Sequence, residues 1–389
     1  MAIDPADIAI CLEDHPARAP GAQPMATPIV QTSLFAYPDL DSFSAAAKEE
    51  YRNYIYTRGQ NPTVELLEKK LAALEHGEAC KCFASGMAAM SAVVMGLLKS
   101  GDHILFVNQT YGPMMQLARH LQRFGIEHSL LLDLEPADVA AAMKPNTKLV
   151  WLENPGTMVM RTFDIAAVAD VARKHGALTC IDNSWATPLF QKPLTHGVDI
   201  VVHSATKYIG GHSDVVAGAV ITTAERMKEI FYRAFLLNGG IMAPFDAWLL
   251  IRGMRTLPVR MQQHETDTLK VAEFLRTRAD VKQVFHPRFN EPSKALIGYS
   301  GLFSFELVDG RFETVRQFID RLKRFRIGIS WGGVESLVIS PNRGHNLAYL
   351  DANRMPHGLV RLSIGLEGAN VLIDDIAQSL DSLKMKASH

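Results

Sequence analysis

Between residues 103 and 222, short apolar runs alternate with stretches of helical periodicity. The runs are HILFVN, HSLLLD, KLVWLEN, LTCID, DIVVHS and GAVITT, and between them PMMQLARHLQRFG and DIAAVADVARKHG carry apolar residues at helical spacing. Strands that alternate with helices of about 10–15 residues are joined by crossover connections, which place parallel strands in a sheet covered on both faces. The alternation therefore predicts an α/β domain with a mostly parallel sheet.

The segments on either side of this region have a different character. Residues 62–77 place apolar residues at helical spacing and end on Gly77, which predicts one amphipathic helix. Residues 1–50 contain several prolines and little periodicity, so we expect an extended segment that contacts a partner subunit. From Phe245 onward helical patterns predominate around the strand-like LFSFELV and HGLVRLSIG. The expected organisation is an N-terminal segment over 1–50, an α/β domain over 51–245 and a smaller α+β domain over 246–389.

Composition narrows the class of ligand. A formal net charge of −1 over 389 residues leaves no basic stripe for nucleic acid, so a small molecule is the expected partner. No apolar run approaches the roughly 20 residues that cross a bilayer, and the first residues lack the pattern of a secretory signal. We therefore expect a cytoplasmic protein with no membrane partner. The spacing of Cys80 and Cys82 does not suit zinc, and we expect reduced thiols and no metal.

Ligands of open α/β sheets bind beyond the carboxyl ends of the strands, so residues that follow the apolar runs are candidates for a site. The run DIVVHS leads into Ser204, Thr206 and Lys207, where an inward-facing amine would lie among hydroxyl and backbone N–H groups able to bind an anion. A surface lysine is the ordinary alternative. Asp182 ends LTCID and could pair with a protonated ring nitrogen, although a helix cap explains it equally well.

Two further clusters offer contacts for a phosphate and for an aromatic ring. Ser85, Gly86 and Met87 form a small-residue turn that opens a helix, where N–H groups and the helix dipole favour a phosphate. A simple helix cap by Ser85 is the alternative. Tyr111 follows HILFV and presents an aromatic face that could stack on a ring, unless it is a core residue.

Tyr56 and Arg58 supply a phenol and a guanidinium in YIYTRG, and arginine suits bidentate recognition of a phosphate. An arginine exposed to solvent is the ordinary alternative. Taken together, the clusters provide a Schiff-base lysine, an acid for a ring nitrogen, a stacking aromatic group and phosphate donors. This set is what pyridoxal 5′-phosphate requires of a protein. The sequence therefore predicts a pyridoxal-phosphate enzyme whose cofactor is bound to Lys207.

Over nearly its whole length the chain resembles the Cys/Met-metabolism family of pyridoxal-phosphate enzymes, which includes cystathionine γ-synthase, cystathionine β- and γ-lyases and methionine γ-lyase. The motifs that carry the resemblance are Tyr56 to Arg58, Ser85 to Met87, Tyr111-Gly112, Asp182-Asn183, Ser204 to Lys207, Gly211 to Asp214, Ser330 to Ser336 and Val360 to Gly365. The resemblance implies the aspartate-aminotransferase (type I) fold, with a seven-stranded sheet. It also implies a homotetramer, a dimer of dimers, whose active sites are shared across the close dimer.

The resemblance also implies roles for individual residues. Tyr56 and Arg58 would reach the phosphate of the neighbouring subunit, and Ser85, Gly86, Met87, Ser204 and Thr206 would complete the phosphate site. Tyr111 would stack on the cofactor ring, and Asp182 would keep the ring nitrogen protonated. Arg361 would pair with the substrate carboxylate, unless it is a surface residue, and Tyr56, Ile329, Ser330 and Trp331 would line the substrate site.

The implied reaction is removal of the Cα proton by Lys207, whose pKa burial should lower, followed by loss of a thiolate from Cβ. Lys207 or Tyr111 would protonate the leaving thiolate, and the remaining fragment would hydrolyse to pyruvate and ammonia. Pro113, Trp185 and Trp331 resemble the β-lyase branch, as does the stretch Glu153–Met158, which lacks an Asn-Pro ending.

The expected activity is therefore α,β-elimination of cystathionine or a related thioether, closest to cystathionine β-lyase. Ile329 favours a smaller or less polar thioether than cystathionine, because an apolar side chain cannot pair with a distal ammonium group. The alternatives are γ-elimination or γ-replacement, a racemase side activity, and a catalytically silent protein that binds the cofactor for regulation or assembly.

Overall fold

The computed structural model describes residues 3–14, 24–290 and 293–384. Its larger sheet has seven strands in the order β1-β7-β6-β5-β4-β2-β3. These strands are β1 (Ala79–Phe83), β2 (His103–Val107), β3 (Glu127–Leu131), β4 (Thr147–Glu153), β5 (Leu178–Asp182), β6 (Ile200–His203) and β7 (Gly218–Thr222). The four pairings from β6 to β3 are parallel, whereas β7 runs antiparallel to both of its neighbours. The predicted mostly parallel sheet is confirmed.

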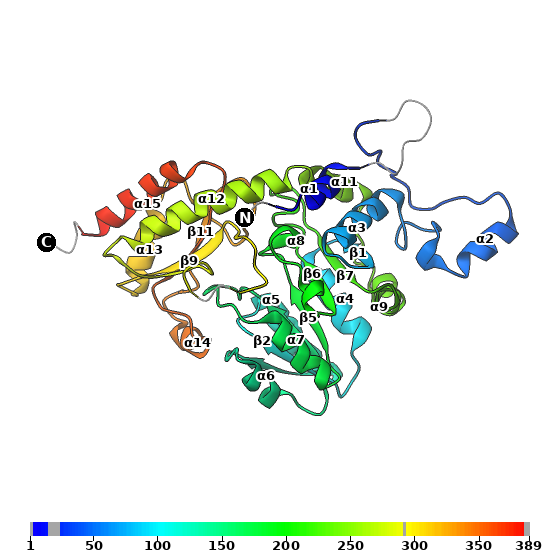
Figure 1. The fold of residues 1–389 in the computed structure, drawn as a ribbon, viewed down its shortest axis with the longest axis horizontal. Helices are drawn as coiled ribbons and strands as arrows, with labels where there is room; N and C mark the ends of the chain where they lie inside the picture. The colour runs from blue at the N-terminus through cyan, green and yellow to red at the C-terminus, as the bar shows by residue number, and fades with distance from the viewer. Residues whose placement is uncertain (1–2, 15–23, 291–292, 385–389) are drawn as a thin grey trace.

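Helices cover both faces of this sheet (Figure 1). They are α3 (Pro62–Leu74), α4 (Gly86–Leu97), α5 (Gly112–Leu121), α6 (Pro136–Ala142), α7 (Ile165–Lys174), α8 (Thr187–Phe190), α9 (Ala224–Ile230), α10 (Leu236–Asn238) and α11 (Pro244–Met254). Alternate residues of one strand enter different cores: Leu105 and Val107 of β2 belong to the core that contains the buried α3 side chains, while Ile104 and Phe106 belong to the core that contains those of α4. Burial on both faces explains why the strands read as continuous apolar runs.

A smaller sheet has the order β10-β11-β12-β9-β8. Its strands are β8 (Val281–Phe285), β9 (Leu302–Leu307), β10 (Arg326–Ile327), β11 (Leu337–Ile339) and β12 (Leu359–Ser363), and its helices are α12 (Leu257–Arg276), α13 (Phe312–Asp320), α14 (Leu347–Ala352) and α15 (Ala369–Lys384). In Figure 1, α12 runs from the large sheet to the small one. Leu257 and Met261 of α12 belong to the first core, and Val271 and Leu275 to the core of the small sheet. The domain boundary at residue 246 stays a prediction.

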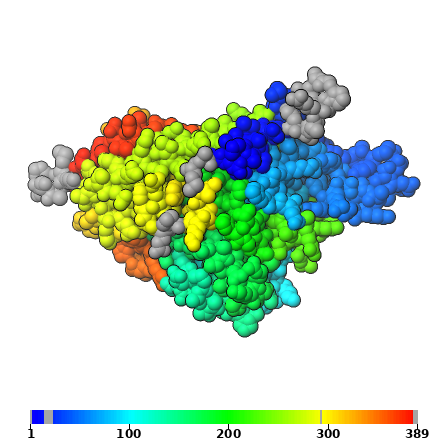
Figure 2. All heavy atoms as spheres, viewed as in Figure 1, coloured from blue at the N-terminus to red at the C-terminus, as the bar shows by residue number. Residues whose placement is uncertain are grey.

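The described part of the N-terminal segment contains two short helices, α1 (Pro5–Leu12) and α2 (Leu40–Ala47). Helix α1 lies against α3 and α11, and the Lys70 amine is 2.6 Å from the Asp14 carboxylate beside it. Helix α2 instead projects from the edge of the molecule, as Figures 1 and 2 show. The predicted contact of this segment with a partner subunit stays a prediction. Among the helices described, none has the length and apolar character of a membrane span.

Candidate active site

The carboxyl ends of β4, β5 and β6 lie side by side in the large sheet. Glu153 is the register partner of Asp182, and Asp182 that of Val202, two residues before Ser204. Parallel strands end at the same edge of a sheet, so residues far apart in the sequence meet there. This edge brings together Asp182, Ser204 and the Lys207 loop, as the sequence predicted.

A serine ties Asp182 to the next strand. The Ser184 N–H and hydroxyl both donate to Asp182 Oδ1, at 2.9 and 2.5 Å, and the Ser204 N–H donates to the Ser184 hydroxyl oxygen at 2.6 Å. Helix α8 begins later, with Ala186 at its N-cap, so Asp182 does not cap that helix. Burial raises the pKa of Asp182, and the Ser184 hydrogen bonds and the charges of His203 and Lys207 oppose that rise.

Lys207 is not a surface lysine. Its amine donates to the Ser330 hydroxyl at 2.8 Å and lies 5.3 Å from the centre of the Trp331 ring. Burial, and next the positive charge of Arg361, lower the pKa of Lys207 to about 8, while the charge of Asp182 acts in the opposite direction. A lysine in such surroundings exchanges protons readily near neutral pH.

The start of α4 lies against the end of β6. Ser85 is the N-cap of α4 and accepts the Ala88 N–H at 3.0 Å, so the capping alternative describes its side chain. A Cβ at Gly86 would lie 3.0 Å from the Ser204 hydroxyl oxygen, which explains why glycine suits this close approach. The first N–H groups of a helix have no partner within that helix, and this helix start lies beside Ser204.

Thr206 holds its loop to the residue before β7. Its hydroxyl donates to the Ala217 carbonyl at 3.1 Å and accepts the Ala217 N–H at 2.9 Å. The hydroxyl proton is thus used in holding the loop that carries Lys207 against β7. A role of Thr206 in phosphate binding stays a prediction.

Tyr111 is not a core residue, since 43% of it is exposed. It is the N-cap of α5, and its N–H donates to Glu153 Oε1 at 2.5 Å. Desolvation raises the pKa of Tyr111, and the charges of Asp182 and Glu153 add to that rise. The phenol therefore keeps its proton over the ordinary pH range.

Glu153 lies at the same edge of the sheet, paired in register with Asp182, and was not predicted as a candidate site residue. It is buried, and burial followed by the charge of Asp182 raises its pKa well above the usual value. The signal was present in the sequence, because Glu153 follows an apolar run in the same way as Asp182 does.

Arg361 lies in β12 and is 7% exposed, which excludes the alternative of a surface arginine. Its guanidinium donates to the Ile329 carbonyl at 2.8 Å. Burial lowers the pKa of Arg361 to about 10, so it remains charged at neutral pH. Ile329 itself is 82% exposed.

Tyr56 and Arg58 lie beside each other at the surface. The Arg58 guanidinium carbon lies 5.7 Å from the Tyr56 ring centre, and both residues are exposed. Within the described residues, no hydrogen bond or ion pair joins either side chain to Lys207 or Asp182. The predicted phosphate contacts of Tyr56 and Arg58 stay predictions.

These surroundings suit pyridoxal 5′-phosphate. A partly desolvated lysine, a carboxylate on the adjacent strand and a helix start within one loop of the lysine are the donor set that this group requires. The prediction of each residue's contact with the cofactor remains untested.

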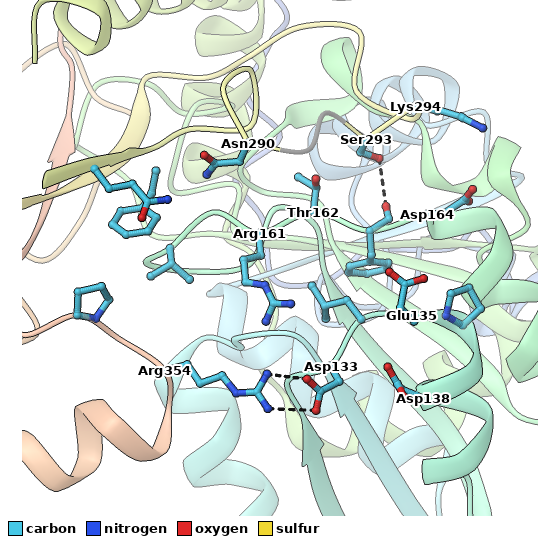
Figure 3. A pocket seen from close by; sticks show the side chains of 17 residues that line it. Asp133, Glu135, Asp138, Arg161, Thr162, Asp164, Asn290, Ser293, Lys294 and Arg354 are labelled. Atoms are coloured by element: carbon cyan, nitrogen blue, oxygen red, sulfur yellow. Dashed lines mark hydrogen bonds and ion pairs between the residues drawn. The ribbon is translucent and has the colours of Figure 1, made fainter. Parts of the chain in front are cut away.

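Figure 3 shows a separate cavity of about 900 Å³ between the β3–α6 region and the small sheet. Arg354 pairs there with Asp133, at 2.7 Å between guanidinium and carboxylate atoms, and Arg161 lies beside them. None of Lys207, Asp182 or Tyr111 lines this cavity, so it is distinct from the candidate site at the strand ends.

Comparison with known proteins gives a consistent result. Residues 10–381 match the family described as Cys/Met metabolism PLP-dependent enzyme. The chain is 38% identical to cystathionine γ-lyase from Bacillus subtilis, over 92% of this chain and 95% of that protein, and 36% identical to cystathionine β-lyase from Lactococcus lactis, over 92% and 94%. It is 39% identical to L-methionine γ-lyase from Porphyromonas gingivalis, over 92% and 93%.

A crystal structure of cystathionine γ-synthase from Xanthomonas oryzae pv. oryzae in complex with cystathionine superimposes with a TM-score of 0.89 at 34% identity. The match covers 97% of this chain and 98% of that one. The fold is therefore that of the type I pyridoxal-phosphate enzymes, and the cofactor is pyridoxal 5′-phosphate. The chain belongs to the Cys/Met metabolism family of PLP-dependent enzymes.

Proposed function

We propose that this protein is a carbon–sulfur lyase that carries out α,β-elimination on a cysteine thioether, giving pyruvate, ammonia and a thiol. The observation that carries the proposal is the position of the Lys207 amine, which hydrogen-bonds Ser330 and lies over Trp331. Bound pyridoxal phosphate supplies an electron sink for the electrons left on Cα.

Lys207 is suited to move the Cα proton. A pKa of about 8 leaves a useful fraction of the amine unprotonated near neutral pH, and the same group can return a proton in a later step. The Ser330 hydroxyl fixes the direction of the amine. Tyr111 is suited to donate a proton to the leaving thiolate, because its raised pKa keeps the phenol protonated until the carbon–sulfur bond breaks.

Arg361 is the candidate for binding the substrate carboxylate. It is a buried cation whose charge contributes to lowering the pKa of Lys207. The charge of Tyr111 in turn raises the pKa of Arg361, against the effect of burial. Pairing a buried guanidinium with a carboxylate orients the substrate and satisfies both charges. Ile329, next to this position, offers no charge for a distal ammonium group, which favours thioethers smaller than cystathionine.

The β-type reaction is supported by Trp185 and Trp331, two positions at which the sequence resembles the β-lyase branch. The Lys207 amine lies over the Trp331 ring, and the buried Trp185 indole N–H donates to the Leu302 carbonyl at 2.9 Å. The alternative is γ-elimination or γ-replacement. It is favoured by the relatives named cystathionine γ-lyase and L-methionine γ-lyase.

A product assay distinguishes these reactions. With L-cystathionine and the holoenzyme, α,β-elimination releases pyruvate, ammonia and homocysteine, whereas γ-elimination releases 2-oxobutyrate, ammonia and cysteine. Chromatography of the keto acids separates the two, and S-methylcysteine and methionine extend the test to small β- and γ-thioethers. Racemisation without keto acid, or a protein without the Schiff-base absorbance, would contradict the lyase proposal.

We further propose that the protein assembles as a homotetramer whose sites are shared between subunits. Apolar side chains exposed on the N-terminal arm support an interface there: Met25 81%, Leu34 57%, Leu40 76% and Phe43 40% exposed. Exposed apolar groups in such number on one projecting segment are typical of an association surface. Tyr56 pairs with Leu34 of this segment through a backbone bridge, so Tyr56 and Arg58 would lie close to a neighbouring subunit that packs there.

A further inference from the structure

A buried polar cluster lies directly behind the strand ends that form the site. The Glu75 carboxylate, just after α3, and the His203 ring, at the end of β6, are both almost fully buried, with 2.6 Å between Glu75 Oε1 and His203 Nε2. The Asn183 side-chain amide donates to the same oxygen at 2.7 Å. A single carboxylate oxygen therefore joins the ends of β5 and β6.

The cluster continues to the end of β4. Gln191 donates to the Asn183 side-chain carbonyl at 2.9 Å and to the Asn154 backbone carbonyl at 2.9 Å. The Asn154 side-chain amide donates back to the Gln191 side-chain oxygen at 3.2 Å. Each of the three strands thus contributes one residue to the cluster.

These residues alternate with the residues of the site. Asn154 follows Glu153, Asn183 follows Asp182, and His203 precedes Ser204. Successive residues at a strand end point to opposite sides, so the cluster is a second layer behind the predicted cofactor contacts. A shift of Glu75 would act on Asp182 and on the Ser204–Lys207 loop together.

Burying this polar cluster in the core costs folding free energy. Glu75 Oε2 and His203 Nδ1 are buried without a hydrogen-bond partner among the described residues. Apolar side chains of the same size would often give equal or greater stability at such a position. Stability alone therefore does not account for a carboxylate there.

We propose that Glu75 is a positioning residue for the cofactor site. Its carboxylate oxygen accepts hydrogen bonds from Asn183 and His203, and this fixes the separation between Asp182 and Lys207. The inference rests on the proposed roles of these two residues. The physical basis is that a reacting group held even 1 Å from its productive place loses about 100-fold in rate, and that second-layer contacts set such placement.

The test compares four variants as apoprotein and holoprotein. Glu75→Ala removes the bridging oxygen, and Glu75→Gln retains one carbonyl oxygen in its place. His203→Gln removes the imidazole. The matched control is His103→Gln, since His103 is an equally buried histidine that joins Thr147 and Ser129 at the opposite, amino end of the strands, at 2.9 Å each.

Three quantities are measured: the dissociation constant of pyridoxal phosphate from the apoprotein, the pH midpoint of the Schiff-base absorbance, and the melting temperature of the apoprotein. We expect Glu75→Ala and His203→Gln to weaken cofactor binding about tenfold or more and to move the absorbance midpoint. Glu75→Gln should stay within about threefold of the wild type, because it keeps the acceptor oxygen. His103→Gln should lower the melting temperature and leave the other two quantities unchanged.

A lower melting temperature of Glu75→Ala with unchanged cofactor affinity and absorbance midpoint would overturn the proposal and make Glu75 a structural residue. If Glu75→Ala does not fold, Glu75→Gln and His203→Gln decide the matter, and wild-type cofactor affinity in His203→Gln overturns it. Lys207→Ala identifies a different failure. A Schiff-base absorbance that persists in this variant would refute the proposed site itself, whatever Glu75 does.

Discussion

The Lys207 amine lies 2.8 Å from the Ser330 hydroxyl oxygen, and this hydrogen bond joins the loop after β6 in the large sheet to the segment before β11 in the small one. The proposed base is therefore aligned by a residue that the other sheet supplies. The relative position of the two sheets controls the direction of the amine.

Replacing Ser330 by alanine should remove this alignment. We expect kcat of Ser330→Ala to fall about tenfold with a smaller change in KM, because a misdirected base affects the proton transfer more than binding. Steady-state kinetics with the substrate identified by the product assay measures this. Ser330→Thr keeps the hydroxyl and serves as the control, and an equal loss of kcat in both variants would argue against the alignment role.

The lowered pKa of Lys207 predicts how the apoprotein takes up its cofactor. Only the unprotonated amine attacks the cofactor aldehyde, so the rate of uptake should rise with pH through about 8 and then level off. Stopped-flow absorbance on the apoprotein follows this rate. A rate that continues to rise towards pH 10 would show that Lys207 is not desolvated as described.

Asp182→Asn should separate charge from shape at the ring-nitrogen position. Asparagine retains an oxygen that can accept from the Ser184 N–H and hydroxyl, but it carries no charge to keep a ring nitrogen protonated. We expect kcat to fall about 100-fold or more, with a melting temperature close to that of the wild type. Wild-type turnover in this variant would remove Asp182 from its proposed role.

Glu153→Gln should make the apoprotein relatively more stable as the pH rises. The pKa of Glu153 is raised in the folded state, so its carboxyl contributes fully to stability below the unfolded value of about 4.5 and that contribution is lost above it. Glutamine mimics the protonated acid and does not titrate. The melting temperature of the variant minus that of the wild type should therefore increase from pH 5 to pH 8, and a constant difference would contradict the raised pKa.

Site sharing between subunits predicts complementation. Arg58→Ala and Lys207→Ala should each be nearly inactive. When the two variants are unfolded and refolded together, a mixed dimer should contain one site with both defects and one intact site, which amounts to about a quarter of the wild-type sites after random pairing. Activity measured before and after mixing tests this. No recovery in a mixture shown to contain hybrids would place Arg58 in the same site as Lys207 or outside it.

Much of the site was already determined by the sequence. The alternation of buried strands with helices fixes a mostly parallel sheet, and polar residues that follow those strands must gather at one edge. That rule found Asp182, Ser204 and Lys207 without any contact information. The same rule applied to β4 also finds Glu153, whose stretch had indicated only a resemblance to the β-lyase branch.

Tertiary structure decided what each of these side chains contacts. No local pattern shows that Arg361 is buried against the Ile329 carbonyl or that Ser330 accepts the Lys207 hydrogen bond. Nor does it show that the Thr206 hydroxyl donates to the Ala217 carbonyl. These contacts join residues from different strands and from both sheets, so they depend on how the sheets pack. Periodicity reports which face of an element is buried, whereas the partner of a buried polar group is set only when distant segments meet.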